Sequence, residues 1–259
     1  MAEITILIEH LPWSESDKRY SIEELGVLLM LALQRNRVGK CLITADVFLR
    51  KLGYKNPNKE DIDHIDQIIG KLCNRNCVDD YIIVSRVGPE SHIDKRLPMN
   101  ICVVYNHYDA KGAYCVITED DIEALSLASM KSRHNFYAFL AVYLVIMEHT
   151  EKECYMDQFG NVCKGHIGFV SKKFIGNTIG VSENTVHGYL SIMETEKIIG
   201  VAHSGEYKNV NSYAIPSTEY LIEASAKRTA RVFGGMLHKD TNTERVKYSY
   251  RKKKYGGVC

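Results

Sequence analysis

The sequence has no long apolar run and shows no recognisable secretory signal. Its longest uninterrupted apolar run, residues 136–147, is twelve residues long, whereas a bilayer-spanning helix needs about 20. The run therefore predicts a buried core helix. The chain starts Met-Ala-Glu-Ile-Thr, without the basic n-region of a secretory signal. Its eight cysteines are then expected to be reduced thiols of a cytoplasmic protein without membrane contact.

The chain also lacks the common signatures of catalysis and metal binding. It contains no glycine-rich phosphate loop ending in Gly-Lys-Ser/Thr, no His-Glu-x-x-His and no Gly-x-Ser-x-Gly motif. Cys73 and Cys77 lie four residues apart near His64, so two ligands fit one helix face. No second pair follows at zinc-finger spacing, which favours ordinary thiols over a metal site. We expect no enzyme, no cofactor and no metal.

Net charge is +1, which alone indicates no partner, but the charge is unevenly distributed. Residues 227–259 carry ten Lys or Arg against Asp240 and Glu244, a net of +8. The preceding residues therefore carry −7. An acidic body with a basic tail indicates a polyanionic partner.

Helical periodicity and capping residues predict the elements of the first third. Ser21 and Thr44 stand where an N-cap is expected, and β-branched runs follow the last helix. The expected elements are a strand at 4–8, helices at 21–34, 45–52 and 60–74, and a hairpin of 81–87 with 100–106.

The remaining sequence repeats this order without a literal sequence repeat. A polar stretch at 151–166 predicts a connection, and "KIIGVAHSGEYKNVNSYAIP" predicts a hairpin. The other expected elements are a strand at 114–118 followed by a helix capped by Thr118, and helices at 134–149, 171–178 and 182–196. Two similar small α+β modules are favoured over one enzyme-like sheet.

"FIGNTIGVSENTVHGYL", residues 174–190, has a glycine pattern with a physical reason. A side chain at Gly176 would push apart the two helices, and Gly180 tolerates the positive φ of a tight turn. Val186 lies among apolar positions that join the helices. Ser182 is expected as N-cap, which leaves a polar edge outward: Glu183, Asn184, Thr185, His187, Gly188 and Ser191.

This stretch resembles the helix-turn-helix of winged-helix DNA-binding proteins. The resemblance covers residues 133–215 well and extends to 22–106 only by element order, with Leu49 where a small residue is expected. It implies a mainly α fold with small β wings (α+β) and two winged helix-turn-helix modules. The expected division is 1–112, 113–226 and a basic tail at 227–259. A glycine-containing corner in a helical protein that binds no DNA is the structural alternative.

The resemblance implies that the second helix of the motif enters the major groove. Asn184 would then pair with adenine, and Thr185, His187 and Ser191 would contact bases. Glu183 and the lack of exposed Arg or Lys on this helix favour the alternative, a solvated polar face. Phosphate contacts are expected from Ser182, Lys172, Lys173, Lys208, Lys227, Arg228, Arg231, Lys252 and Lys253.

The tail and the first module have different expected partners. Tyr248, Tyr250 and Tyr255 alternate with cations, which suits stacking on unpaired bases; a disordered solubilising tail is the alternative. The third helix of the first module would repel phosphate, so its face is expected to meet a second copy or a partner protein. Its acids are Glu60, Asp61, Asp63 and Asp66, and the nearby Arg50, Lys51 and Lys55 are expected to be ordinary surface charges.

Tandem modules of this kind are similar to replication initiators and replisome organisers of plasmids and phages of Gram-positive bacteria. The similarity lies in "FYAFLAVYLVIMEH" followed by "FVSKKFIGNTIGVSENTVHGYLSIMETEKII". It implies binding of double-stranded origin DNA, self-association and recruitment of host replication proteins. A winged-helix transcriptional regulator is the first alternative. A tandem winged-helix interaction subunit that contacts protein rather than DNA is the second.

Overall fold

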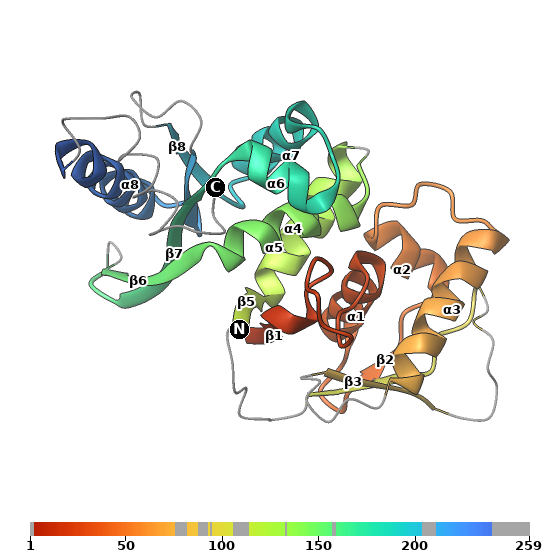
Figure 1. Cartoon of the computed structure of the whole chain (residues 1–259). Helices are drawn as coiled ribbons and strands as arrows, with labels where there is room; N and C mark the ends of the chain where they lie inside the picture. The colour runs from red at the N-terminus through yellow and green to blue at the C-terminus, as the bar shows by residue number, and fades with distance from the viewer. Residues whose placement is uncertain are drawn as a thin grey trace. The chain divides into compact units, whose positions relative to one another are not determined.

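The computed structural model describes residues 3–75, 82–87, 93, 95–105, 114–132, 134–156, 159–203 and 211–239. The chain forms two compact units, Met1–Ala141 and Val142–Cys259 (Figure 1). The division falls inside helix α5 (Phe136–Glu148). Both units combine helices with antiparallel strands, so the expected α+β class is confirmed. The expected module boundary at 112/113 lies outside the described residues.

Unit 1 has a three-stranded antiparallel sheet, ordered β2-β4-β3, and a separate pair of strands, β1-β5. Helix α1 is buried continuously from Leu25 to Ala32, because its apolar positions occupy most of its circumference. The elements of this unit are β1 (Glu3–Leu7), a 3-10 turn (Ile8–His10), α1 (Ile22–Gln34), β2 (Lys40–Cys41), α2 (Ala45–Lys51), α3 (Lys59–Asn74), β3 (Ile82–Arg86), β4 (Ile101–Tyr105), β5 (Tyr114–Thr118) and α4 (Glu119–Ser132).

Unit 2 has a four-stranded antiparallel sheet in the order β6-β7-β9-β8. One face of this sheet is covered by helix α8, which contacts β7, β8 and β9 (Figure 1). The elements that follow α5 are β6 (Thr150–Met156), β7 (Val162–Val170), α6 (Lys172–Ile179), α7 (Glu183–Thr195), β8 (Gly200–His203), β9 (Asn211–Ile215) and α8 (Glu219–Lys239).

The two units share an element order and a sheet order. The first has α1-β2-α2-α3-β3-β4 with strands arranged β2-β4-β3. The second has α5-β7-α6-α7-β8-β9 with strands arranged β7-β9-β8. In each, the first strand of the series pairs with the third, and the third with the second. The strand β6 and the helix α8 are additions in the second series.

The helices begin where their capping residues predict. Glu24 N–H donates to Ser21 Oγ at 3.1 Å, and Ser21 N–H donates back to Glu24 Oε2 at 2.8 Å. This reciprocal pair satisfies two backbone donors at the start of α1. Thr44 caps α2 in the expected way, and Thr118 Oγ1 accepts from Asp121 N–H at 3.2 Å.

One sequence expectation is wrong: residues 151–166 are not a polar connection. Residues 151–156 and 162–166 belong to the strands of a long hairpin, in which Thr150 opposes Gly168 and Met156 opposes Val162. On one side of the hairpin Tyr155 stacks on Tyr220 of α8, with 5.8 Å between ring centroids. The outward side mixes Lys152 and Lys164 with exposed Met156 and Val162, so the segment shows no clean alternation of apolar and polar residues.

Candidate nucleic-acid interface

The turn between α6 and α7 is built on the two predicted glycines. Gly180 ends α6 with φ 75° and ψ 29°, the left-handed region that favours glycine. Its N–H and that of Val181 both donate to the carbonyl of Gly176. A Cβ on Gly176 would lie 2.6 Å from the Val181 carbonyl oxygen, closer than side chains tolerate. The close approach of the two helices therefore requires Gly176.

Apolar residues of α7 anchor it to the unit on one side. Val186 and Met193 are fully buried, and Leu190 nearly so, at the i, i+4 and i+7 positions of one stripe. Ile175 of α6 is also fully buried. The stripe fixes which edge of α7 faces outward.

The outward edge of α7 is the predicted one. Glu183, Asn184, Thr185, His187, Gly188 and Ser191 are all exposed. Ser182 caps the helix by accepting from Thr185 N–H at 3.1 Å, and the two hydroxyls lie 2.8 Å apart. Ser191 Oγ donates to the His187 carbonyl at 2.9 Å. Within the described part of the chain, no hydrogen bond engages the Asn184 amide, so its donor and acceptor remain available.

A contact between the two helices was not predicted: Lys172 Nζ lies 3.4 Å from His187 Nδ1. An ammonium group only donates, so Nδ1 must accept, which places the imidazole proton on Nε2. In this contact His187 therefore presents an N–H donor at Nε2. The two residues are fifteen positions apart, and no local sequence signal connects them.

The predicted phosphate-contacting residues fall into three groups. Lys173 is exposed and Lys172 half-buried at the start of α6, and the exposed Ser182 caps α7, so all three lie beside the turn. Lys208, Lys252 and Lys253 lie outside the described residues, as do Tyr248, Tyr250 and Tyr255. The rest lie on α8.

Part of the expected tail, residues 227–239, is helical. Lys227 Nζ lies 2.6 Å from Glu223 Oε1, and Arg228 pairs with Glu151 of β6, so both charges have acidic partners inside the unit. Arg231 is exposed. Exposed pairs of this kind contribute roughly 0–1 kcal/mol, little enough for a phosphate to displace the carboxylate.

A polar seam attaches α8 to the sheet. Ser212 Oγ donates to Thr229 Oγ1 at 2.7 Å, and Thr229 Oγ1 donates to the Ser225 carbonyl at 2.9 Å. Ser225 Oγ lies 2.8 Å from the Tyr213 carbonyl and 3.1 Å from that of Gly168. All three hydroxyl groups are buried and satisfied.

The seam predicts how far the chain can be shortened. Ending it after Ala226 removes Thr229, so the Ser212 hydroxyl loses both its acceptor and part of the cover that α8 provides, at a cost of about 1–3 kcal/mol in unfolding free energy. Ending it after Lys239 keeps α8 intact, so the stability of unit 2 is retained. Thermal unfolding followed by circular dichroism compares the two; equal midpoints would contradict the seam's contribution.

The corresponding helix of unit 1, α3, is acidic on its outer side. Glu60 and Asp63 are exposed, and Asp66 Oδ1 accepts from Arg86 at 2.7 Å. Of the three cations expected to be surface charges near α2, Arg50 donates to Asp46 Oδ2 and to the Lys55 carbonyl, both at 2.9 Å. Its guanidinium is therefore engaged within the unit.

Metal-ligand candidates do not come together in the described residues. His64 Nε2 lies 3.1 Å from Glu23 Oε2, and Cys77 is outside the described residues. Burial raises the pKa of the Cys73 thiol, which disfavours the thiolate that metals bind. No group of three or more His, Cys, Asp or Glu side chains in the described ranges is arranged to hold a metal.

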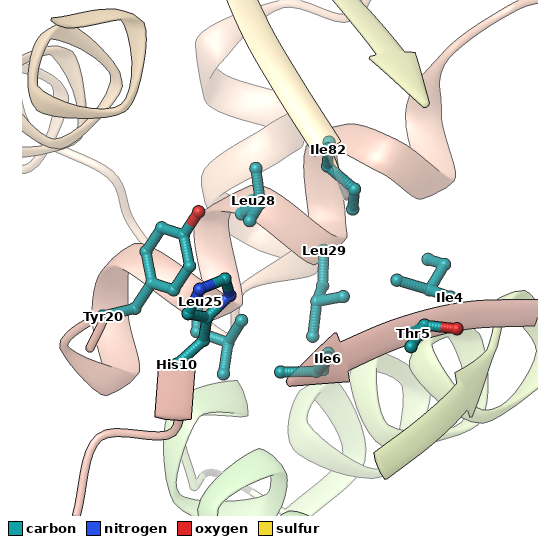
Figure 2. A pocket seen from close by; sticks show the side chains of 9 residues that line it. All are labelled: Ile4, Thr5, Ile6, His10, Tyr20, Leu25, Leu28, Leu29 and Ile82. Atoms are coloured by element: carbon teal, nitrogen blue, oxygen red, sulfur yellow. The ribbon is translucent and has the colours of Figure 1, made fainter. Parts of the chain in front are cut away.

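A small cavity in unit 1 is lined by β1, α1 and Ile82 (Figure 2). His10 and Tyr20 meet there edge to face, with ring centroids 5.7 Å apart. Its volume of about 20 Å³ holds roughly one water molecule and no organic substrate.

No helix among the described residues is both long and apolar enough to cross a bilayer. Comparison of the chain with protein-family models, with curated proteins and with solved structures gave no match.

Proposed function

We propose that the chain binds duplex DNA sequence-specifically through α7, with α6, α7, β8 and β9 acting as a winged helix. The observation that carries the proposal is the outward polar edge of α7, held by the Gly176–Gly180 turn against a buried apolar stripe. The β7-β9-β8 strand order supports it, because a winged helix also pairs its first strand with its third. The wing tip would be the β8–β9 connection.

The edge offers groups that suit base edges in the major groove. Asn184 carries an amide that pairs with adenine N6 and N7. His187, with its proton on Nε2, donates to an acceptor such as guanine N7 or thymine O4. The Ser191 hydroxyl donates within α7 and so offers chiefly an acceptor, whereas the Thr185 hydroxyl shares a hydrogen bond with Ser182 in which either oxygen can donate. This set predicts a preference for sites that contain adenine.

The first unit supports a role beyond simple binding. It shares the sheet order of unit 2, but residues 52–58 separate α2 from α3, and Leu49 is fully buried where unit 2 has Gly176. With the acidic outer side of α3, this favours a protein-contacting module. A DNA-binding unit joined to a protein-contacting one suits a replication initiator or replisome organiser that binds an origin and recruits replication proteins.

Exposed Glu60 and Asp63 of α3 also favour a second candidate, a tandem winged-helix interaction subunit that binds no DNA. Such a protein would leave duplex DNA unshifted at low salt and co-purify with a large partner. A transcriptional regulator, in contrast, would footprint a promoter palindrome, and an initiator repeated sites near its own coding region.

The expected phosphate contacts of Lys172 and Lys173 are tested with a double variant that combines Lys172→Gln with Lys173→Gln. Each phosphate contact contributes about one unit to the slope of log K against log salt, so the slope should fall by about 2 while base preference persists. Fluorescence anisotropy on a random-sequence duplex measures it. Lys71→Gln, an exposed lysine of α3, is the matched control and should leave the slope unchanged. An unaltered slope in the double variant would remove these lysines from the interface.

A further inference from the structure

The outer face of the unit 1 sheet is apolar where water would ordinarily favour polar side chains. Ile83 of β3 directly opposes Val104 of β4, and they are 46% and 52% exposed. Val87 extends the ladder by donating to the Asn100 carbonyl at 2.7 Å, and is 43% exposed. We define the outer sheet face by six residues that alternation places on one side: Lys40, Ile83, Ser85, Val87, Cys102 and Val104.

The opposite face of the same sheet is the one that packs on the unit's core. Ile82 lies beside Leu28 and Leu29 of α1 (Figure 2), and Arg86 reaches Asp66 of α3. Both residues alternate with those of the outer sheet face. No described helix of unit 1 covers the outer side. An antiparallel sheet with one solvated face normally carries polar residues there, so adjoining β-branched residues indicate an interaction surface.

In unit 2, the sheet with the same strand order has its corresponding face covered by a helix. There α8 packs Leu221 against Ile167 of β7 and Ala214 of β9. A Cβ on Gly200 of β8 would lie 2.3 Å from Ile222 Cγ1, so the helix contacts the sheet closely. In unit 1 the corresponding strands carry Ile83 and Val104 instead of such small residues, which suits a helix that packs further out.

We propose that the outer sheet face of unit 1 binds an amphipathic helix of a partner protein, with carboxylates flanking the helix's apolar stripe. The carboxylates on the partner helix are inferred from the positive charge at this surface. Lys40 lies on the face itself, Arg37 is exposed in the adjoining turn, and none of the six face residues is acidic. The proposal concerns unit 1 and stands independently of DNA binding by α7.

The test uses the full-length protein with labelled Ile and Val methyl groups and a synthetic helical peptide as probe. The peptide carries leucine at i, i+3, i+4 and i+7 with glutamate on both flanks; one control peptide has lysine in place of glutamate, and another has a scrambled order. The glutamate peptide should shift the methyl resonances of Ile83, Val87 and Val104. Val47, an exposed valine of α2, should not shift.

Variants make the test specific. Ile83→Thr with Val104→Thr keeps β-branched residues in the strands, so the sheet persists, but peptide affinity should fall at least about tenfold because apolar contact is lost. Val47→Thr should change nothing. Lys40→Glu should weaken the glutamate peptide and strengthen the lysine peptide.

Four results would overturn the proposal. The first is that the glutamate peptide leaves the methyl resonances of the outer sheet face unshifted, and the second is that the scrambled peptide shifts them equally. The third is that these resonances shift with protein concentration when no peptide is present, and the fourth is that duplex DNA shifts them. The third would assign the face to a second copy of the chain, and the fourth to nucleic acid. DNA binding that fails while the peptide still binds would refute the α7 proposal alone.

Discussion

Valine in place of Gly176 is expected to lower the unfolding free energy of unit 2 by about 3 kcal/mol. A Cβ at this position already lies 2.6 Å from the Val181 carbonyl oxygen, a backbone atom that cannot move without opening the turn. The helix propensity gained by replacing glycine, at most about 1 kcal/mol, is too small to offset this clash. The two γ-methyl groups of valine add to the overlap.

Gly188 provides the matched control because it lies in the interior of α7, where a Cβ would have open space for 4 Å around it. Gly188→Ala should therefore raise stability by roughly 0.5–1 kcal/mol through helix propensity alone. Urea unfolding followed by circular dichroism measures both. If Gly176→Val proved as stable as Gly188→Ala, α6 and α7 would not meet as closely as described.

Local signals in the sequence sufficed for the helices between residues 21 and 196 and for their starts. Ser21, Thr44 and Ser182 cap the helices they were expected to cap, because an N-cap is a contact between residues three positions apart. The exposed edge of α7 followed for a related reason. Once Val186 faces inward, the 3.6-residue period decides which neighbours face outward.

Local sequence signals did not predict contacts between segments that lie far apart in the chain. The β6–β7 hairpin was missed because its solvated side mixes charged residues with exposed Met156 and Val162, which hides the period-2 pattern. The sequence analysis also did not predict helix α8. One reason is that the side of α8 that faces the sheet contains Ser225 and Thr229 beside Leu221. Those hydroxyls pair with Ser212 and with backbone carbonyls, so polar residues occupy positions that patterning reserves for apolar ones.

The candidate site shows the same division. Its glycines and outward residues were predicted, whereas the Lys172–His187 contact depends on how α6 crosses α7. Arg228 likewise meets Glu151 only because α8 returns across the hairpin. These contacts decide which donors remain for a ligand, and the sequence alone offers no means of finding them.

Selection of bound fragments from a random duplex pool tests the central proposal most directly. The full chain is compared with a variant carrying Asn184→Ala, Thr185→Ala and His187→Ala. The variant should keep its fold, because Ser182 still accepts from the N–H of residue 185, and alanine favours helix. We expect it to retain low-salt binding through its cations and to lose all sequence preference. Enrichment of the same sequence motif by both proteins would contradict base contact by α7.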